Sequence, residues 1–155
     1  LIGASPGLED VNLRRKRYQT DGVLAKKILL IGARQFMKEW QNKPLINSQR
    51  NIAPDIYFNM LKRRYDNCPL GLANSLQALS TGILPSLWGE LHRICVPVYL
   101  FTGESDKKFC QIAQKMKELL PRARHIVVPK AGHAAHLENM RFFSAYLKHV
   151  IRQLN

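Results

Sequence analysis

Val96-Pro97-Val98-Tyr99-Leu100-Phe101-Thr102-Gly103-Glu104-Ser105-Asp106 is the stretch that decides the fold. Its first six residues are apolar, β-branched or aromatic, which is typical of a strand buried on both faces of a parallel sheet. Apolar residues at helical spacing follow over 109–120, a second short apolar run covers 125–129, and an amphipathic pattern occupies 140–154. This order predicts a parallel strand–helix–strand unit with a right-handed crossover, followed by a closing helix.

The N-terminal part of the chain has a different pattern. Residues 1–7 look like the end of a core strand meeting a turn, residues 8–92 are predicted to form a helical cap or lid insertion, and residues 93–155 the C-terminal βαβα part of the core. A chain rarely begins at the end of a core strand, and three parallel strands alone would leave a long sheet edge bare. We therefore expect further strands from an N-terminal half of the same domain. A second copy of the chain is the alternative partner for that edge.

Composition and charge narrow the classes of protein. A chain of 155 residues with 46% hydrophobic and 23% charged residues has the ordinary composition of one globular domain. It shows no signal-peptide pattern and no apolar run near the roughly 18 residues of a membrane span. The net charge of +13 favours an anionic partner, such as nucleic acid, an acidic membrane surface or a polycarboxylated metabolite. Cys68, Cys95 and Cys110 have neither metal-type nor redox-type spacing, which predicts reduced thiols and a cytoplasmic location.

An acid and a histidine follow the two predicted strands. Asp106 comes five residues after Phe101, and His133 comes five residues after Val128. Parallel strands present functional loops at their carboxyl edge, so we expect these two side chains to meet there. The carboxylate would fix the imidazole tautomer and stabilise the imidazolium, and the imidazole would activate a serine hydroxyl or shuttle a proton. The alternative for Asp106 is a turn residue or an N-cap of the next helix.

This order of acid and then histidine matches the α/β-hydrolase fold, whose catalytic triad runs nucleophile, acid, histidine along the chain. We predict an α/β protein, the C-terminal part of an α/β-hydrolase fold with three parallel strands, flanking helices and a helical cap insertion. We also predict that the chain contains no serine nucleophile elbow. His133, His136 and Glu138 would suit a metal by residue type, but their spacing differs from that of helical zinc sites and no cysteine is near, so no metal site is predicted.

Two basic runs, residues 13–17 and 62–64, are by default solvated helix faces. In a functional interpretation, one arginine from each run points inward and binds a carboxylate of a ligand with two hydrogen bonds. A basic, non-catalytic module that binds nucleic acid or an acidic protein is a competing hypothesis. It is disfavoured because aromatic residues are not interleaved with the basic runs as stacking platforms would require.

Several stretches of the chain also match a known family. They lie in the turn after the first predicted strand, in the predicted cap and in the acid and histidine loops: residues 5–8, the arginine-rich segment through Arg17, Trp40 before Pro44, and residues 71–76, 81–82, 85–88, 103–109, 111–113 and 131–138. On these residues the chain resembles the 2-succinyl-6-hydroxy-2,4-cyclohexadiene-1-carboxylate (SHCHC) synthases of menaquinone and phylloquinone biosynthesis, members of the α/β-hydrolase superfamily. The cap stretches are specific to this family, whereas the acid and histidine loops are shared across the fold.

The resemblance implies a lyase that eliminates pyruvate from a tricarboxylated cyclohexene precursor without a cofactor. It implies that Asp106 and His133 are the acid and histidine of a triad whose serine acts as a base toward a substrate carbon. Because the serine elbow belongs to the N-terminal half of such enzymes, we expect the 155-residue chain alone to be inactive.

The resemblance also implies a set of substrate contacts. Arg17 and Arg64 would hold substrate carboxylates, Arg63 is the alternative to Arg64, and Trp40 would line the pocket. The implied partner is an anionic polycarboxylate, with no nucleic acid and no membrane span. A generic esterase or carbon–carbon hydrolase of the same fold is the alternative activity, and a plastid is the alternative location for a photosynthetic eukaryote.

Overall fold

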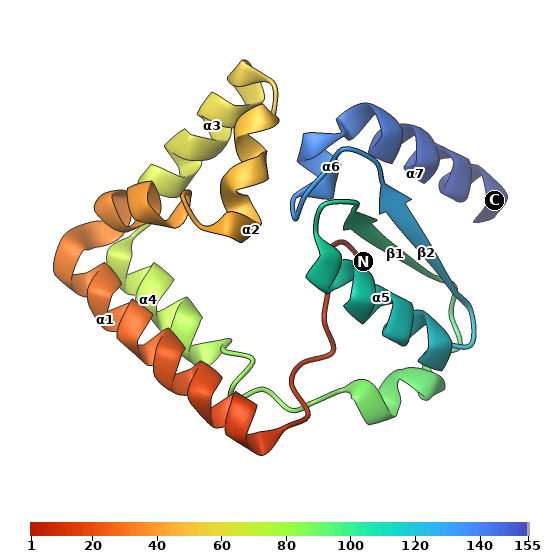
Figure 1. The fold of residues 1–155 in the computed structure, drawn as a ribbon, viewed down its shortest axis with the longest axis horizontal. Helices are drawn as coiled ribbons and strands as arrows, with labels where there is room; N and C mark the ends of the chain where they lie inside the picture. Colours follow the sequence, from red (N-terminus) through yellow and green to blue (C-terminus); the bar gives the residue numbers. More distant parts are fainter. Residues whose placement is uncertain (155) are drawn as a thin grey trace. The chain divides into compact units, whose positions relative to one another are not determined.

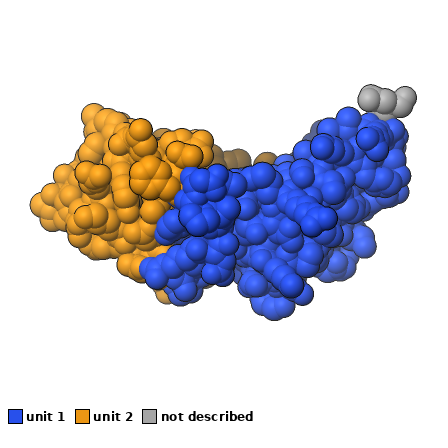
Figure 2. Space-filling view, turned by 90° about the horizontal axis from the view of Figure 1, so that it is seen from above, with its two compact units in different colours: residues 1–5, 44–57, 90–155 blue, residues 6–43, 58–89 orange. Residues whose placement is uncertain are grey.

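The computed structural model describes residues 1–154 and divides the chain into two compact units (Figures 1 and 2). Unit 1 takes in residues 1–5, 44–57 and the chain from residue 90 onward. Unit 2 consists of residues 6–43 and 58–89. Residues 44–57 thus group with the sheet, although they lie inside the predicted cap of residues 8–92, whose boundaries stay a prediction.

A parallel two-stranded sheet forms the centre of unit 1 (Figure 1). Strand β1 (Val98–Gly103) pairs with β2 (Ala123–Val128) in a register that matches Val98 to Ala123 and Gly103 to Val128. Helix α5 (Lys107–Leu119) connects the two strands, so the predicted strand–helix–strand unit is confirmed. The remaining elements of unit 1 are α2 (Pro44–Asn47), η1 (Ser48–Asn51), α6 (Ala135–Glu138) and α7 (Met140–Leu154). A further element, η2 (Trp88–Arg93), begins in unit 2 and continues into unit 1.

The first residues of the chain extend this sheet by a single bridge. Ile2 pairs in parallel with Phe101, while Phe101 N–H donates to the Leu1 carbonyl at 2.8 Å and Gly3 N–H donates to the Phe101 carbonyl at 2.9 Å. Strand β1 is therefore flanked by residues 1–3 on one edge and by β2 on the other. Of the third predicted strand, residues 1–154 contain only this bridge, and the backbone leaves the sheet after Gly3, which has a φ of 51°.

Side chains that alternate along β1 pack against two different helices. Phe101 faces α7, where its ring contacts Phe143 and Tyr146 at centroid distances of 4.9 and 5.6 Å. Thr102 faces α5 and lies 3.2 Å from the Cys110 thiol. The core on the α7 side consists of Phe101, Ile126, Val128, Ala131 and Ala135. Helices thus lie over both faces of the sheet, although the cover over β2 is incomplete, since Val127 is still 44% exposed.

Unit 2 is helical. Helix α1 (Val11–Trp40) starts at the N-cap Asp10 and is broken at Gly32, whose φ of 76° lies outside the helical region. Helix α4 (Pro69–Ala78) packs on α1 around Ala25, Ile28 and Ala73. Helix α3 (Pro54–Tyr65) begins in unit 1 and continues into unit 2. None of the helices within residues 1–154 combines the length and the apolar character that crossing a membrane requires.

Candidate functional site

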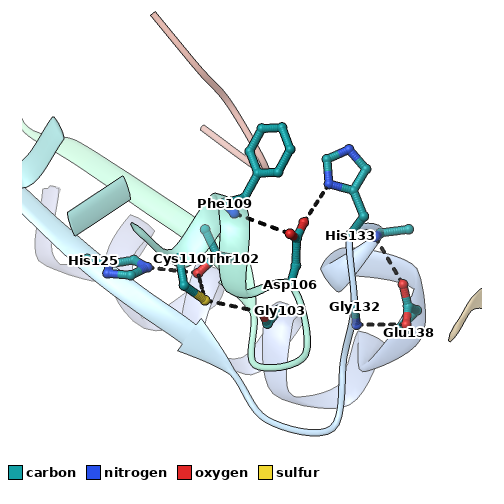
Figure 3. Close-up of polar contacts among 10 residues, drawn as sticks. Thr102, Gly103, Asp106, Phe109, Cys110, His125, Gly132, His133 and Glu138 are labelled. Atoms are coloured by element: carbon teal, nitrogen blue, oxygen red, sulfur yellow. Dashed lines mark hydrogen bonds and ion pairs between the residues drawn. The ribbon is translucent and has the colours of Figure 1, made fainter. Parts of the chain in front are cut away.

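Asp106 lies directly after β1 and performs two tasks at once (Figure 3). Its Oδ1 accepts a hydrogen bond from Phe109 N–H at 3.2 Å and so caps the N-terminus of α5. Its Oδ2 lies 2.8 Å from Nδ1 of His133. The N-cap and the imidazole partner, which the sequence offered as alternatives, are therefore both present. The side chain is only 3% exposed, so both oxygens depend on these protein donors.

His133 follows β2 and presents its ring to that carboxylate (Figure 3). A carboxylate only accepts hydrogen bonds, so Nδ1 carries the proton and Nε2 is left as the basic nitrogen. The ring also packs on Phe109, with centroids 4.6 Å apart. Unlike Asp106, the His133 side chain is 30% exposed. This arrangement, with a buried acid orienting a more accessible imidazole, is suited to proton transfer by Nε2.

Two glycines allow the loops that carry these residues to approach each other. A Cβ on Gly103 would lie 2.1 Å from the Gly132 carbonyl oxygen, a distance that no real side chain tolerates. A Cβ on Gly132 would lie 2.2 Å from the hydroxyl of Ser48. The end of β1 and the histidine loop are therefore packed backbone against backbone, with the Ser48 side chain of η1 against Gly132, and this close packing brings Asp106 to His133.

The carboxylate of Glu138 binds backbone amides of the histidine loop (Figure 3). Its Oε2 accepts from Gly132 N–H at 2.7 Å, and its Oε1 accepts from Ala134 N–H at 3.0 Å. Burial lowers the pKa of nearby His136, an effect that the Glu138 charge partly opposes. Within residues 1–154, no group of three or more His, Cys, Asp or Glu side chains gathers closely enough to hold a metal ion.

A cavity of about 270 Å³ opens beside the Asp106–His133 pair, within unit 1. Its lining residues come from α2, η1 and the acid and histidine loops: Pro44, Leu45, Ser48, Ser105, Asp106, Gly132 and His133. Sequence reasoning did not single out Ser48 or Ser105 as site residues. Ser105 could have been found, because it precedes the acid in the same strand-end loop, whereas Ser48 reaches the cavity only through tertiary folding.

The nucleophile elbow needs more than its sequence pattern. The letters Gly3-Ala4-Ser5-Pro6-Gly7 fit Gly-x-Ser-x-Gly, so the absence of an elbow cannot be taken from the letters alone. A working elbow places its serine on a strained turn from a strand directly into a helix. Here Ser5 has no positive φ, and no helix begins before Val11. Within residues 1–154, Ser5 therefore does not stand on such a turn, although the sequence does contain a Gly-x-Ser-x-Gly pattern.

The substrate-binding residues suggested by the resemblance lie in unit 2. Arg17 and Trp40 line one cavity of about 320 Å³, whose walls are mainly apolar. The Arg17 Nε–H donates to both carboxylate oxygens of buried Asp21, at 2.9 and 2.8 Å, and Ser80 also donates to Asp21 at 2.8 Å. Trp40 stacks on Phe36, with ring centroids 5.5 Å apart. This cavity thus has a charged end and an aromatic wall.

The two candidate arginines of α3 differ in exposure. Arg64 is half-buried, whereas its neighbour Arg63 is exposed. Neither lines the cavity that contains Arg17 and Trp40. Of the two, the burial favours Arg64 as the inward-facing residue.

Comparisons with known proteins identify what the chain is similar to. No protein-family model matches it. A putative SHCHC synthase of Bacillus subtilis is 44% identical over 143 residues, which is 92% of this chain and 52% of that protein. The SHCHC synthase of Serratia proteamaculans is 30% identical over 96% of the chain and 55% of that protein. The chain thus spans about half the length of these curated relatives.

Comparison with solved structures identifies the fold. MenH from S. aureus superposes with a TM-score of 0.95 at 30% identity, over 99% of this chain and 57% of that one. A thermophilic esterase from Thermogutta terrifontis superposes with a TM-score of 0.71 at 14% identity, a likeness of fold alone. The predicted fold class, the C-terminal part of an α/β-hydrolase fold, and the resemblance to SHCHC synthases are both confirmed.

Proposed function

We propose that this chain supplies the acid, the histidine and the cap of an SHCHC synthase, a lyase that eliminates pyruvate from a tricarboxylated cyclohexene. The observation that carries the proposal is the 2.8 Å contact between His133 Nδ1 and Asp106 Oδ2 at the carboxyl edge of the sheet. It is supported by a similarity to SHCHC synthases that extends over 92% of the chain.

The proposed chemistry follows from the orientation of the imidazole. Asp106 holds the Nδ1–H of His133, so Nε2 can take the proton of a serine hydroxyl supplied by a nucleophile elbow outside this chain. The serine oxygen then removes a proton from a substrate carbon. The electron pair of that C–H bond moves into the ring as a new double bond while the C–O bond to the leaving group breaks. The leaving group departs as the enolate of pyruvate, which takes the proton carried by the His133 imidazolium and becomes pyruvate, so that serine and histidine return to their starting states. Asp106 stabilises the imidazolium meanwhile.

The cavity that contains Arg17 and Trp40 combines apolar walls with a guanidinium group. An apolar wall with Trp40 would take the cyclohexene ring, and Arg17 would take a carboxylate. A guanidinium has five N–H donors, and the pairing with Asp21 uses only the Nε–H. We assign a second carboxylate to Arg64, and the +13 net charge would draw a polyanion toward the protein. We place the protein in the cytoplasm, where its free thiols Cys68, Cys95 and Cys110 would stay reduced.

Complementation tests the proposal. The 155-residue chain alone is expected to release no pyruvate from the precursor, and co-expression with the part of the Bacillus subtilis relative outside the matched region is expected to restore release. Restored activity should disappear in His133→Ala and persist in Ser5→Ala. Pyruvate release by the chain alone, abolished by Ser5→Ala, would mean that the chain provides its own serine and would overturn the division of labour.

Tests with a series of substrates distinguish the proposed lyase from the alternative activity, that of a generic esterase. If the restored enzyme hydrolyses uncharged esters and ignores the tricarboxylated precursor, the chain belongs to a hydrolase and the lyase proposal is wrong. If it acts on the precursor, Arg17→Gln should raise KM for the precursor and leave any ester hydrolysis unchanged.

A further inference from the structure

We propose that Glu138 is a positioning residue, which holds His133 against Asp106 by binding the backbone on both sides of the histidine. Its two carboxylate oxygens accept from Gly132 N–H at 2.7 Å and from Ala134 N–H at 3.0 Å. These amides belong to the residues immediately before and after His133. Figure 3 shows the Glu138 carboxylate beside the chain at Gly132, with Asp106 on the other side of that chain.

The pair of bonds does more than begin a helix. Ala134 is the N-cap of α6, and a glutamate that reaches back to the N-cap amide is a known way to secure the first turn. Gly132 lies two residues before that cap and outside the helix. The bond to Gly132 therefore satisfies no amide of α6 or of its N-cap, and its direct effect is to fix the position of the histidine loop.

Ser48 also packs against this part of the loop. A Cβ at position 132 would lie 2.2 Å from the Ser48 hydroxyl and 3.1 Å from Oε2 of Glu138, so only glycine fits there. Glu138 restrains residue 132 through a hydrogen bond to a charged acceptor, which is stronger than one between neutral groups.

The consequence for catalysis rests on the proposed function. His133 must keep its Nδ1 at 2.8 Å from Asp106 while Nε2 meets the serine. Displacement of a catalytic group by about 1 Å can cost roughly 100-fold in rate. Glu138 lines neither of the two cavities described above, so its loss should lower kcat by about 10- to 100-fold and leave KM nearly unchanged.

The first readout needs no substrate. In the 155-residue chain, the proton on His133 Nδ1 should give a protected signal in ¹H–¹⁵N NMR, because it is held by Asp106. Glu138→Ala should broaden or remove that signal. Glu138→Gln keeps one acceptor oxygen and places an NH₂ group against an amide N–H, so it should weaken the signal partly.

Glu104→Gln is the matched control. The Glu104 carboxylate also accepts from a backbone amide of the same β2–α6 connection, that of Lys130 at 2.9 Å, but three residues before His133. The Glu104→Gln variant should leave the His133 Nδ1 proton signal and kcat unchanged.

The two readouts separate the failure of this proposal from the failure of the proposed function. A Glu138→Ala chain that keeps the Nδ1 proton signal at wild-type strength overturns the positioning role, whatever the activity. If Glu138→Ala loses the Nδ1 proton signal but no complemented enzyme, wild type included, shows activity, the positioning role is supported and the proposed lyase function is wrong. If both Glu138 variants fail to fold while Glu104→Gln folds, Glu138 serves folding and the positioning proposal is wrong.

Discussion

Replacing Asp106 by asparagine separates its two roles. The carboxylate caps α5 with Oδ1 and binds His133 Nδ1 with Oδ2. An asparagine with its oxygen toward Phe109 N–H keeps the cap and turns its NH₂ group toward Nδ1. Nδ1 must then accept, so the ring proton moves to Nε2, which can no longer take a proton from a serine.

The expected magnitudes differ between folding and catalysis. Asparagine is as good an N-cap as aspartate, so Asp106→Asn should change the free energy of unfolding by only a few tenths of a kcal/mol. Asp106→Ala loses the cap and should cost about 1 kcal/mol. Both variants should lose about 10⁴-fold in kcat, by analogy with the acid of serine proteases, where the wrong tautomer has that effect.

Urea unfolding of the 155-residue chain measures the first quantity, and pyruvate release by the complemented enzyme measures the second. Two results would refute the reasoning. One is an Asp106→Asn enzyme that keeps more than about a tenth of the activity, which would make the imidazole tautomer irrelevant. The other is an equal loss of stability in the asparagine and alanine variants, which would show that the cap is not a separate role.

Three further changes have expected outcomes. Gly103→Ala should lower the free energy of unfolding by about 3 kcal/mol or more, because its Cβ would meet the Gly132 carbonyl, whereas Gly89→Ala, with no atom within 4 Å, should be near neutral in the same urea titration. Burial lowers the pKa values of His125 and His136, so their contribution to stability is present above about pH 6.5 and is lost as the pH falls through the lowered values. Urea titrations at pH 7.5 and 5.5 should therefore show a lower free energy of unfolding at pH 5.5. In a His136→Gln chain this decrease should be smaller. Arg17→Gln in the complemented enzyme should raise KM about 10-fold or more, with kcat less affected, and an unchanged KM would remove Arg17 from the substrate site.

The sequence predicted the part of the fold in which local pattern and tertiary environment agree. A run such as residues 96–101 has few ways to be buried, and the carboxyl ends of neighbouring parallel strands must lie at one edge, so the meeting of Asp106 and His133 followed from topology. The pairing of Arg17 with Asp21 was also open to prediction, because residues four apart lie on one helix face.

Other features depend on partners that a linear pattern does not show. The residue type of Glu138 suits a metal ligand, but the structure pairs its carboxylate with two backbone amides, which a sequence pattern does not distinguish from other amides. Ser48 reaches Gly132 only through tertiary packing. Residues 3–7 give the converse case, since their letters fit a catalytic motif and their backbone does not build it.

The acid–imidazole pair is held by hydrogen bonds within one short region of the chain. Asp106 N–H donates to the Gly103 carbonyl, Oδ1 accepts from Phe109, Oδ2 binds His133, and Glu138 holds the loop on both sides of that histidine. All of these groups lie between residues 103 and 138 of unit 1. The acid–imidazole pair should therefore form before any serine is supplied, and a complementing segment would need to bring only the hydroxyl and the groups that stabilise the departing oxygen. An Nδ1 proton signal in the 155-residue chain that is as strong as in the complemented enzyme would support this preassembly. A signal that appears only on complementation would mean that the second segment, rather than the fold of this chain, orients His133.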